Sequence, residues 1–460
     1  MRTHINIHTL FAFLAILFVT TADYTSAKNR HNLSPVSQSV DSVRFEDYFC
    51  DSTLRLDYIF AGNNRSQYIF FHEASKYKCW AGRRHHLSEL FLKGNGHITV
   101  RDKDSRIIIY TNSFSTLFQE WQTEEEATKV NKCFENSYLI PFPLSPVEVT
   151  VTLNDNHGKV TSEMSHTIDP SDILIRDLSS HTTKYNYVLH SGDVSSCIDI
   201  AIISEGYTIE EMYKFRSDCQ RTVDALFSHE PFTSLKPYFN VLAVECPSPE
   251  SGATIPREHQ WRSLSCGTQY DTFYTDRYLM TSKMWDVYNQ LDNIPFEHII
   301  ILVNSSLYGG GGIFNQINVF PSDHPTFKPL LVHEFGHGYG GLADEYYYDD
   351  QFESKYPSDT EPWEPNITTL VDFKVKWQDM ISPTTTIPTS ERHSFPLSFS
   401  FDDKQKYWTS TIGVFEGGGY QSKGVYRPCQ ECRMKMLEVE DFCPVCSKAL
   451  IDITHFYTRQ

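Results

Sequence analysis

The feature that most constrains the fold is a pair of histidines in a segment bounded by helix signals. His333 and His337 flank Glu334 in the sequence HEFGH. Residues four apart lie on one face of an α-helix, so both imidazoles can reach one cation. We expect this helix to begin near Pro329, a residue that a first turn tolerates, and to end at the glycines of positions 340–341.

The surrounding residues favour a catalytic metal site over a helix that merely carries two surface histidines. Glu334 would sit beside a water on the metal, where a carboxylate can take its proton. An acidic residue after the glycine turn supplies the third ligand that a catalytic zinc needs. If the second glycine makes the turn, the pattern is HExxHxxxGxxD, and it predicts His333, His337 and Asp344 as zinc ligands. Glu345 is the alternative to Asp344, although we interpret it as a carboxylate that supports the site.

The amino-terminal part of the chain has the pattern of a β domain. Between 43 and 178, short apolar runs such as 97–100 (HITV) and 147–151 (VEVTV) are broken by turn residues such as 94–96 (GNG). Short strands at this spacing predict an all-β sandwich domain over 43–178.

The pattern changes over the second domain, which we assign to 197–460. Nearly continuous apolar runs at 197–203 (CIDIAII) and 298–303 (HIIILV) indicate buried strands, and a helical pattern lies between them. Alternation of strands and helices predicts an α/β domain. Residues 350–410 are rich in Pro, Ser, Thr and Asp, and we expect long surface loops there.

Together these segments resemble the IgA-peptidase family of zinc metallopeptidases. The most specific match is 333–346 (HEFGHGYGGLADEY), and 308–312 (YGGGG) and 199–207 (DIAIISEGY) are also similar. The β domain resembles the amino-terminal domain of that family at 54–58 (LRLDY) and 114–121 (FSTLFQEW). The resemblance implies an α/β metzincin-like zinc peptidase domain preceded by an all-β sandwich domain.

The resemblance also implies a methionine-containing turn beneath the metal. The segment 432–434 (CRM) is similar to that turn, so its methionine would be Met434, with Met436 as the alternative. Metzincins place the third ligand six residues after the second histidine, but Ala343 stands at that position and cannot ligate. Asp344, one residue further on, accounts for the shift if the turning glycine is also one residue later.

Amide hydrolysis also needs a group that stabilises the oxyanion. Tyr420 and Tyr426 lie near the methionine turn in sequence and are the candidates. The glycine run at 308–312 precedes the metal helix. It would let a substrate backbone approach closely beside an edge strand, or it forms a plain flexible loop. The family name refers to immunoglobulin A, but no residue of this sequence indicates that substrate.

Four carboxy-terminal cysteines form two CxxC pairs, at Cys429, Cys432, Cys443 and Cys446. Four thiolates in two such pairs suit a second, structural zinc with tetrahedral geometry. In an exported protein two disulfides are favoured instead, with a connectivity that sequence does not determine. The chain has eleven cysteines, so at least one thiol stays outside any intramolecular pairing.

The amino terminus predicts export. Residues 10–19 (LFAFLAILFV) form an apolar run of signal-peptide length, and 25–27 (TSA) offers a cleavage site, so we assign 1–27 as a signal peptide. The alternative is an uncleaved anchor, but this run is short for a bilayer span, and no later run suggests stable membrane insertion. N-glycosylation sequons begin at Asn32, Asn64, Asn304 and Asn366.

The sequence therefore predicts a secreted zinc metallopeptidase that acts on protein or peptide substrates, preferably as an endopeptidase. Glu334 would pass the proton of water to the leaving amine. The main rival is an inactive, zinc-holding extracellular binding or adhesion protein, which would have no need of this proton acceptor. A zinc hydrolase of non-peptide bonds is a second rival. The formal charge of −18 argues against nucleic-acid partners, which need clustered Lys and Arg.

Overall fold

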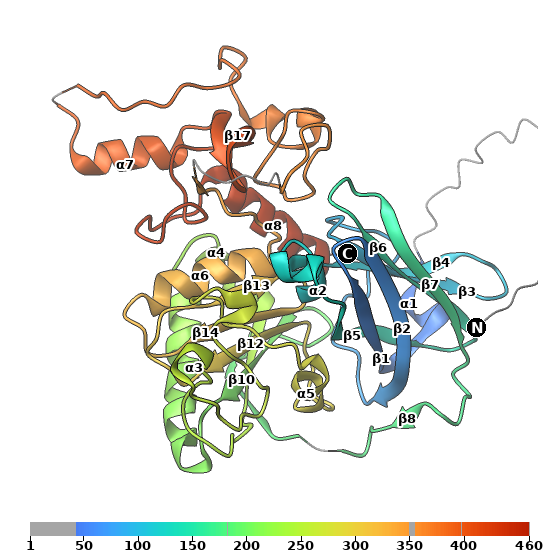
Figure 1. Ribbon diagram of the computed structural model, residues 1–460. Coiled ribbons are helices and arrows are strands. Elements are labelled where there is room, and N and C mark those ends of the chain that lie inside the picture. The colour runs from blue at the N-terminus through green and yellow to red at the C-terminus, as the bar shows by residue number, and fades with distance from the viewer. Residues whose placement is uncertain (1–42, 182, 349–354, 397, 460) are drawn as a thin grey trace, which may run out of the picture. The chain divides into compact units, whose positions relative to one another are not determined.

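The computed structural model describes residues 43–181, 183–348, 355–396 and 398–459 (Figure 1). The expected signal peptide at 1–27 and the sequon at Asn32 lie outside these residues. No helix in the described ranges is long and apolar enough to span a membrane.

The amino-terminal region consists of two four-stranded sheets. One has the order β5-β1-β2-β8 and the other the order β4-β3-β6-β7. Their bounds are β1 Phe49–Asn63, β2 Ser66–Tyr77, β3 Gly96–Asp102, β4 Ile108–Phe114, β5 Lys132–Pro143, β6 Val147–Asn154, β7 Val160–Ile168 and β8 Arg176–Asp177. The β-rich amino-terminal region predicted from the sequence is confirmed.

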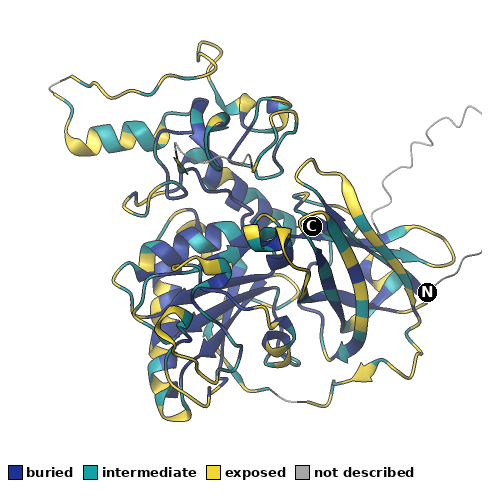
Figure 2. Cartoon of the chain, in the orientation of Figure 1, coloured by how far each residue is buried: buried dark blue, intermediate teal, exposed yellow. Residues whose placement is uncertain are grey.

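Aromatic side chains join the two sheets of this region. Phe114 of β4 lies 4.2 Å from Tyr138 of β5 and 6.3 Å from Phe60 of β1, measured between ring centroids. Burial alternates along β6, as expected for a strand with one face toward a core (Figure 2). The sheets therefore share one aromatic core.

A six-stranded sheet organises the rest of the chain, with the order β13-β14-β12-β10-β11-β9. The bounds are β9 Tyr185–Leu189, β10 Ile198–Glu205, β11 Phe239–Val244, β12 His298–Val303, β13 Gly311–Ile313 and β14 Ile317–Pro321. The four central strands run parallel, and β9 and β13 are antiparallel edge strands. Every residue of β10, β11 and β12 is buried, as a central strand covered on both faces requires.

Helices α3 (Met212–Leu226) and α6 (Phe327–Gly338) pack on one face of this sheet. Ile198, Ile200 and Ile202 of β10 point toward them, whereas Ala201 and Ile203 point into the core shared with the β-rich region. The shorter helices are α1 Phe45–Tyr48, α2 Leu117–Trp121, α4 Phe232–Leu235 and α5 Met284–Asn289. The α/β pattern therefore positions α6 over the strands that lead to the candidate site.

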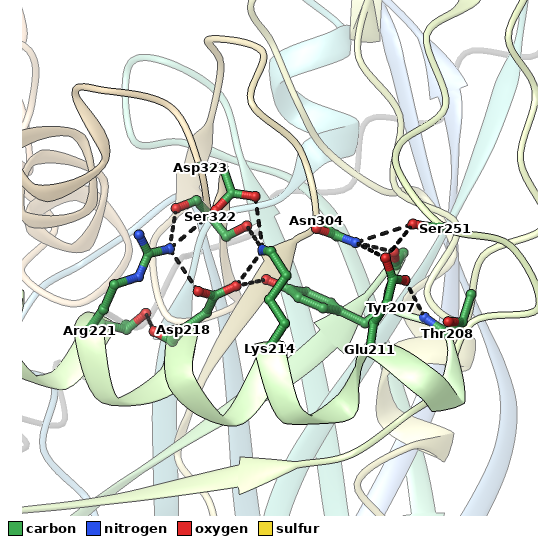
Figure 3. Close-up of polar contacts among 12 residues, drawn as sticks. Tyr207, Thr208, Glu211, Lys214, Asp218, Arg221, Ser251, Asn304, Ser322 and Asp323 are labelled. Atoms are coloured by element: carbon green, nitrogen blue, oxygen red, sulfur yellow. Dashed lines mark hydrogen bonds and ion pairs between the residues drawn. The ribbon is translucent and has the colours of Figure 1, made fainter.

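A polar network fixes the start of α3 against the ends of the central strands (Figure 3). The main-chain amide of Thr208 donates to Glu211, which completes the capping box of the turn before α3. Glu211 also accepts hydrogen bonds from Ser251 and Asn304. Further along the helix, Lys214 and Arg221 pair with acidic groups at Asp218 and Asp323. These ion pairs join α3 to the loop after β14.

The carboxy-terminal part is built from a small sheet and two helices. Its strands are β15 Tyr347–Tyr348, β16 Phe415–Gly418 and β17 Tyr420–Arg427, in the order β15-β17-β16. The helices are α7 Phe401–Ser410 and α8 Pro444–Thr458. Helix α7 lies in the region predicted as surface loops, because Ser400 and Asp403 form a capping box that starts it.

Candidate metal centre

Helix α6 carries the HExxH segment and ends in a glycine turn. Its apolar residues Leu330, Leu331 and Val332 are buried and anchor it in the core. Gly341 has a φ of 60°, the left-handed conformation that ends many helices, and its N–H donates to the carbonyl of His337 at 3.0 Å. The second glycine is therefore the turning residue, as the sequence spacing suggested.

The turn brings three predicted ligands together. Nε2 of His333 and Nε2 of His337 lie 3.1 and 3.2 Å from Oδ1 of Asp344, and the two nitrogens are 3.1 Å apart. A tetrahedral zinc with bonds of about 2.0–2.1 Å separates neighbouring N and O ligands by about 3.3 Å. The spacing of these three atoms thus fits one zinc-sized cation.

Main-chain carbonyls orient both imidazoles. Nδ1 of His333 lies 3.0 Å from the carbonyl oxygen of Arg433, and Nδ1 of His337 lies 2.6 Å from that of Leu342. Each carbonyl can accept a hydrogen bond from Nδ1–H, which leaves the unprotonated Nε2 atoms directed at the candidate metal position.

Tyr420 supports Asp344, the third candidate ligand. Its hydroxyl donates a hydrogen bond to Oδ2 of Asp344 and leaves Oδ1 directed at the histidines. Burial, followed by the charge of Asp344, raises the pKa of Tyr420 well above its usual value, so the phenol keeps its proton. Burial alone would raise the pKa of Asp344, but His337 and the hydrogen bonds to both imidazoles hold it well below the usual range. Asp344 is therefore an anionic donor.

Glu334 is half-buried beside this trio. Burial raises the pKa of its carboxyl, and the neighbouring imidazoles of His333 and His337 partly offset that rise. A Cβ placed on Gly310 would lie 3.4 Å from Cγ and Oε1 of Glu334, so the glycine run passes directly by this carboxylate. Gly310 immediately precedes β13, the edge strand of the sheet.

Met434 lies beneath the ligand helix. It is fully buried, and a Cβ placed on Gly336 of α6 would come within 2.8 Å of its sulfur. Its carbonyl accepts a hydrogen bond from the main-chain amide of Glu345 at 2.8 Å. The alternative, Met436, is 39% exposed. The position beneath the helix is therefore occupied by Met434.

Two other sequence candidates lie away from the histidines. Tyr426 pairs through its main chain with Thr368 and has Glu416 and Lys423 as charged neighbours, so only Tyr420 of the two tyrosines is at the centre. The carboxylate of Glu345 instead contacts Cys446 and Asn366.

Sequence reasoning missed a basic and aromatic group at the site. Arg277 lies close enough to lower the pKa of Glu334, and its guanidinium donates to the hydroxyls of Tyr346 and Tyr348, each at 3.5 Å. Tyr346 also packs edge-on against Tyr420, with ring centroids 5.2 Å apart. Arg277 lies in a loop without a recognisable motif, so no local signal marked it.

The cysteines differ from the disulfide expectation. All eleven are free thiols, and each lies in the described ranges. Cys432, Cys443 and Cys446 cluster with Glu345, and their ligand atoms lie within 4.8 Å of one another. The sulfurs of Cys432 and Cys446 are 3.8 Å apart, far beyond the roughly 2.05 Å of a disulfide. Cys429 is buried and its side chain contacts that of Cys443, but it is not part of the group whose atoms all lie within this distance.

The described sequons differ in their access to solvent. Asn64 is exposed in the turn between β1 and β2. Asn304 donates to the carbonyl of Gly206 at 3.0 Å. Asn366 is fully buried and donates to the carbonyl of Ala343 and to Glu345 at 2.9 and 3.0 Å. A glycan on Asn366 is incompatible with this packing, so that sequon is not a usable site in the folded chain.

Comparison with known families agrees with this architecture. The family model for IgA peptidase M64 matches residues 187–396 and 398–454, and the model for the M64 peptidase amino terminus matches residues 44–165. A search of curated proteins finds no match. Since the first family model covers more than half of the sequence, the chain belongs to the IgA peptidase M64 family and is a peptidase.

Proposed function

We propose that the protein is a zinc-dependent metallopeptidase with a metzincin-like catalytic fold. One observation carries the proposal: His333, His337 and Asp344 converge at about 3 Å beside the carboxylate of Glu334. Two imidazoles and one carboxylate are the ligand type of catalytic zinc sites, which keep a further position open. Met434 beneath the ligand helix supports the metzincin-like interpretation.

A zinc ion held here would supply a Lewis acid that activates water and polarises the scissile carbonyl. His333, His337 and Asp344 hold the ion. Burial alone would lower the pKa of His337, but Asp344 raises it to about 9. A histidine must lose that proton before it can bind a metal ion. Ion binding therefore displaces a proton and weakens at low pH.

Glu334 moves the proton. It lies next to the ligands and has no role in holding them, so its carboxylate is available to accept a proton from the attacking water. Burial raises the pKa of Glu334, which makes its carboxylate a stronger base and suits it to accept the proton of water before passing it to the leaving amine. Arg277, whose charge acts on Glu334, and Tyr346, whose hydroxyl accepts from Arg277, are the candidates for stabilising the oxyanion, because Tyr420 already donates to Asp344.

The sheet edge offers a binding mode for the substrate. Strand β13 is the outermost strand, and a Cβ placed on Gly310, directly before it, would lie 3.4 Å from Oε1 of Glu334. The main chain of Gly310 itself pairs with Arg277 and Leu279, so an added strand would have to pair with β13, which begins at the next residue. An extended peptide can add to such an edge through main-chain hydrogen bonds, with its scissile bond beside the carboxylate. This mode needs no free terminus, so we propose endopeptidase action on protein substrates.

We also propose that the protein is secreted. The support is the apolar run at 10–19 with the cleavage site at 25–27, together with the exposed sequon at Asn64. Amino-terminal sequencing of the exported chain tests this, with Lys28 expected as the first residue. An intact amino terminus would contradict signal-peptide cleavage.

The function is tested by digesting a mixed protein substrate and identifying the new termini by mass spectrometry. We expect internal cleavages that stop when a chelator removes the metal and resume when zinc is restored. A chain that holds zinc but cleaves no peptide bond would support the rival of an inactive binding protein. Cleavage of esters without cleavage of peptides would support the non-peptide hydrolase.

A further inference from the structure

The thiol cluster next to the catalytic site has the composition and geometry of a second metal centre. It consists of Cys432, Cys443, Cys446 and the carboxylate of Glu345, and all four side chains are fully buried. Their ligand atoms lie within 4.8 Å of one another although they come from three separate segments of the chain. We propose that these four groups bind a structural zinc ion that is distinct from the catalytic one.

The sulfur spacing fits a tetrahedral ion. Zinc–sulfur bonds of about 2.3 Å separate two tetrahedral thiolate ligands by about 3.8 Å. The sulfurs of Cys432 and Cys446 are 3.8 Å apart, and Oε1 of Glu345 lies 3.1 Å from the sulfur of Cys446. Three soft thiolates and one carboxylate select zinc over hard cations such as calcium or magnesium.

Main-chain amides point at the sulfurs, as a set of thiolates requires. The amide of Cys443 donates to Cys432 at 3.2 Å, and those of Met434 and Cys446 donate to Cys432 and Cys443 at 3.5 Å. Such hydrogen bonds stabilise the anionic form of a ligand and fix its direction. The amide of Cys446 points at the sulfur of Cys443 because Cys443 is the N-cap of α8.

An unpaired carboxylate oxygen and the cations around the cluster also point to an ion. Oε2 of Glu345 is buried and has no hydrogen-bond partner among the described residues, which is costly for a carboxylate. Arg427, Arg433 and Lys435 interact electrostatically with Glu345 or Cys432. These cations offset the negative charge that three thiolates and a carboxylate leave around a divalent ion.

The second ion would fix the floor of the catalytic site. Glu345 directly follows the ligand Asp344, and its amide donates to the carbonyl of Met434. Cys432 lies one residue before Arg433, whose carbonyl orients His333. A metal that joins Glu345 to Cys432 therefore holds both a ligand and the methionine turn, and the residues around it act as positioning residues.

The test measures metal in a background that lacks the catalytic ligands, so its outcome is independent of peptidase activity. In the full chain with His333→Ala and His337→Ala, we expect one equivalent of zinc to remain bound. Adding Cys443→Ser should remove it. Cys219→Ala, which changes a buried thiol of α3 elsewhere in the fold, should leave it in place. If the variant that lacks only the two catalytic histidines binds no zinc, the proposal is overturned.

The same background tests the fourth ligand. Glu345→Gln should release most of the remaining zinc, whereas Cys429→Ser should retain it. The opposite result would replace Glu345 with Cys429 and overturn the ligand assignment.

X-ray absorption of the zinc-loaded wild-type chain needs no variant to fold. Sulfur scattering is expected, because the catalytic site supplies only nitrogen and oxygen. Scattering from nitrogen and oxygen alone, or mass analysis that finds these cysteines oxidised to disulfides, would rule the centre out.

Discussion

Nδ1 of His333 lies 3.0 Å from the carbonyl oxygen of Arg433, which joins the ligand helix to the turn that contains Met434. This hydrogen bond crosses 100 residues of sequence and fixes which nitrogen of His333 faces Asp344. The geometry of the proposed metal site therefore depends on a carboxy-terminal loop that contributes none of the three proposed ligands.

Removing the Tyr420 hydroxyl should weaken metal binding. In Tyr420→Phe, Oδ2 of Asp344 loses the donor that holds the carboxylate, and we expect zinc affinity to fall roughly 10- to 100-fold. Competition with a chelator measures this change. Tyr426→Phe is the matched control from the same strand and should bind zinc like the wild type. Equal affinities for both variants would show that Tyr420 does not position Asp344.

The helix-ending glycine should not tolerate a side chain. In Gly341→Ala, the residue adopts a left-handed φ at a cost of roughly 1–2 kcal/mol. The new methyl group would also meet Leu92 and Trp363 at 2.7 and 2.8 Å, and such overpacking adds about 1–3 kcal/mol.

Gly158 is the control for this prediction. It has a similar φ of 71°, but nothing lies within 4 Å of a Cβ placed there, so Gly158→Ala should show only the conformational cost. Urea denaturation measures both free energies of unfolding. Equal losses would mean that the packing around Gly341 is loose.

A buried histidine should make stability depend on pH. Burial lowers the pKa of His298 from 6.5 to about 4. Below pH 6.5 the histidine binds a proton in the unfolded chain but not in the folded chain. The stability that is present above pH 6.5 is therefore lost as the pH falls toward 4. The total loss is roughly 3 kcal/mol.

Urea denaturation between pH 4 and 7 checks this effect. His298→Leu should have a shallower pH dependence over this window than the wild type. Tyr339→Phe removes a hydrogen bond to Thr454 in the same core but no group that titrates there, so its curve should run parallel to that of the wild type. Parallel curves for all three proteins would rule out the buried, neutral His298.

Glycosylation should discriminate between the described sequons. After expression in a eukaryotic secretory pathway, peptide mapping should find a glycan at Asn64 and none at Asn366, whose amide is buried against Glu345. Asn64→Gln should remove that glycan. A glycan on Asn366 of the folded protein would contradict the packing around Glu345.

Local signals were sufficient for the elements that carry the ligands. The spacing of His333, His337 and the glycines predicts a helix of the right length, and the shift to Asp344 follows from Gly341 as the turning residue. The continuous apolar runs became β10 and β12. A strand buried on both faces is apolar along its whole length, so the run itself identifies it.

Tertiary contacts decided the rest. Tyr420 and Tyr426 lie in the same strand, and only the fold shows that the first one meets Asp344. The two CxxC pairs suggest four equivalent cysteines, but the chain brings Glu345 to three of them, while Cys429 contacts Cys443 and stays outside that group. The sequence favoured disulfides because an exported protein meets an oxidising environment. That argument does not consider which side chains surround each sulfur.

The most direct test of the account compares zinc content and proteolysis in the wild-type chain and in Glu334→Gln. This substitution keeps the size of the side chain and leaves His333, His337 and Asp344 unchanged. We predict unchanged zinc content with peptide hydrolysis reduced at least about 100-fold, since general base catalysis contributes 10²–10⁴-fold. Equal proteolysis by both chains, or a folded wild-type chain that binds no zinc at these three ligands, would contradict the proposed metallopeptidase.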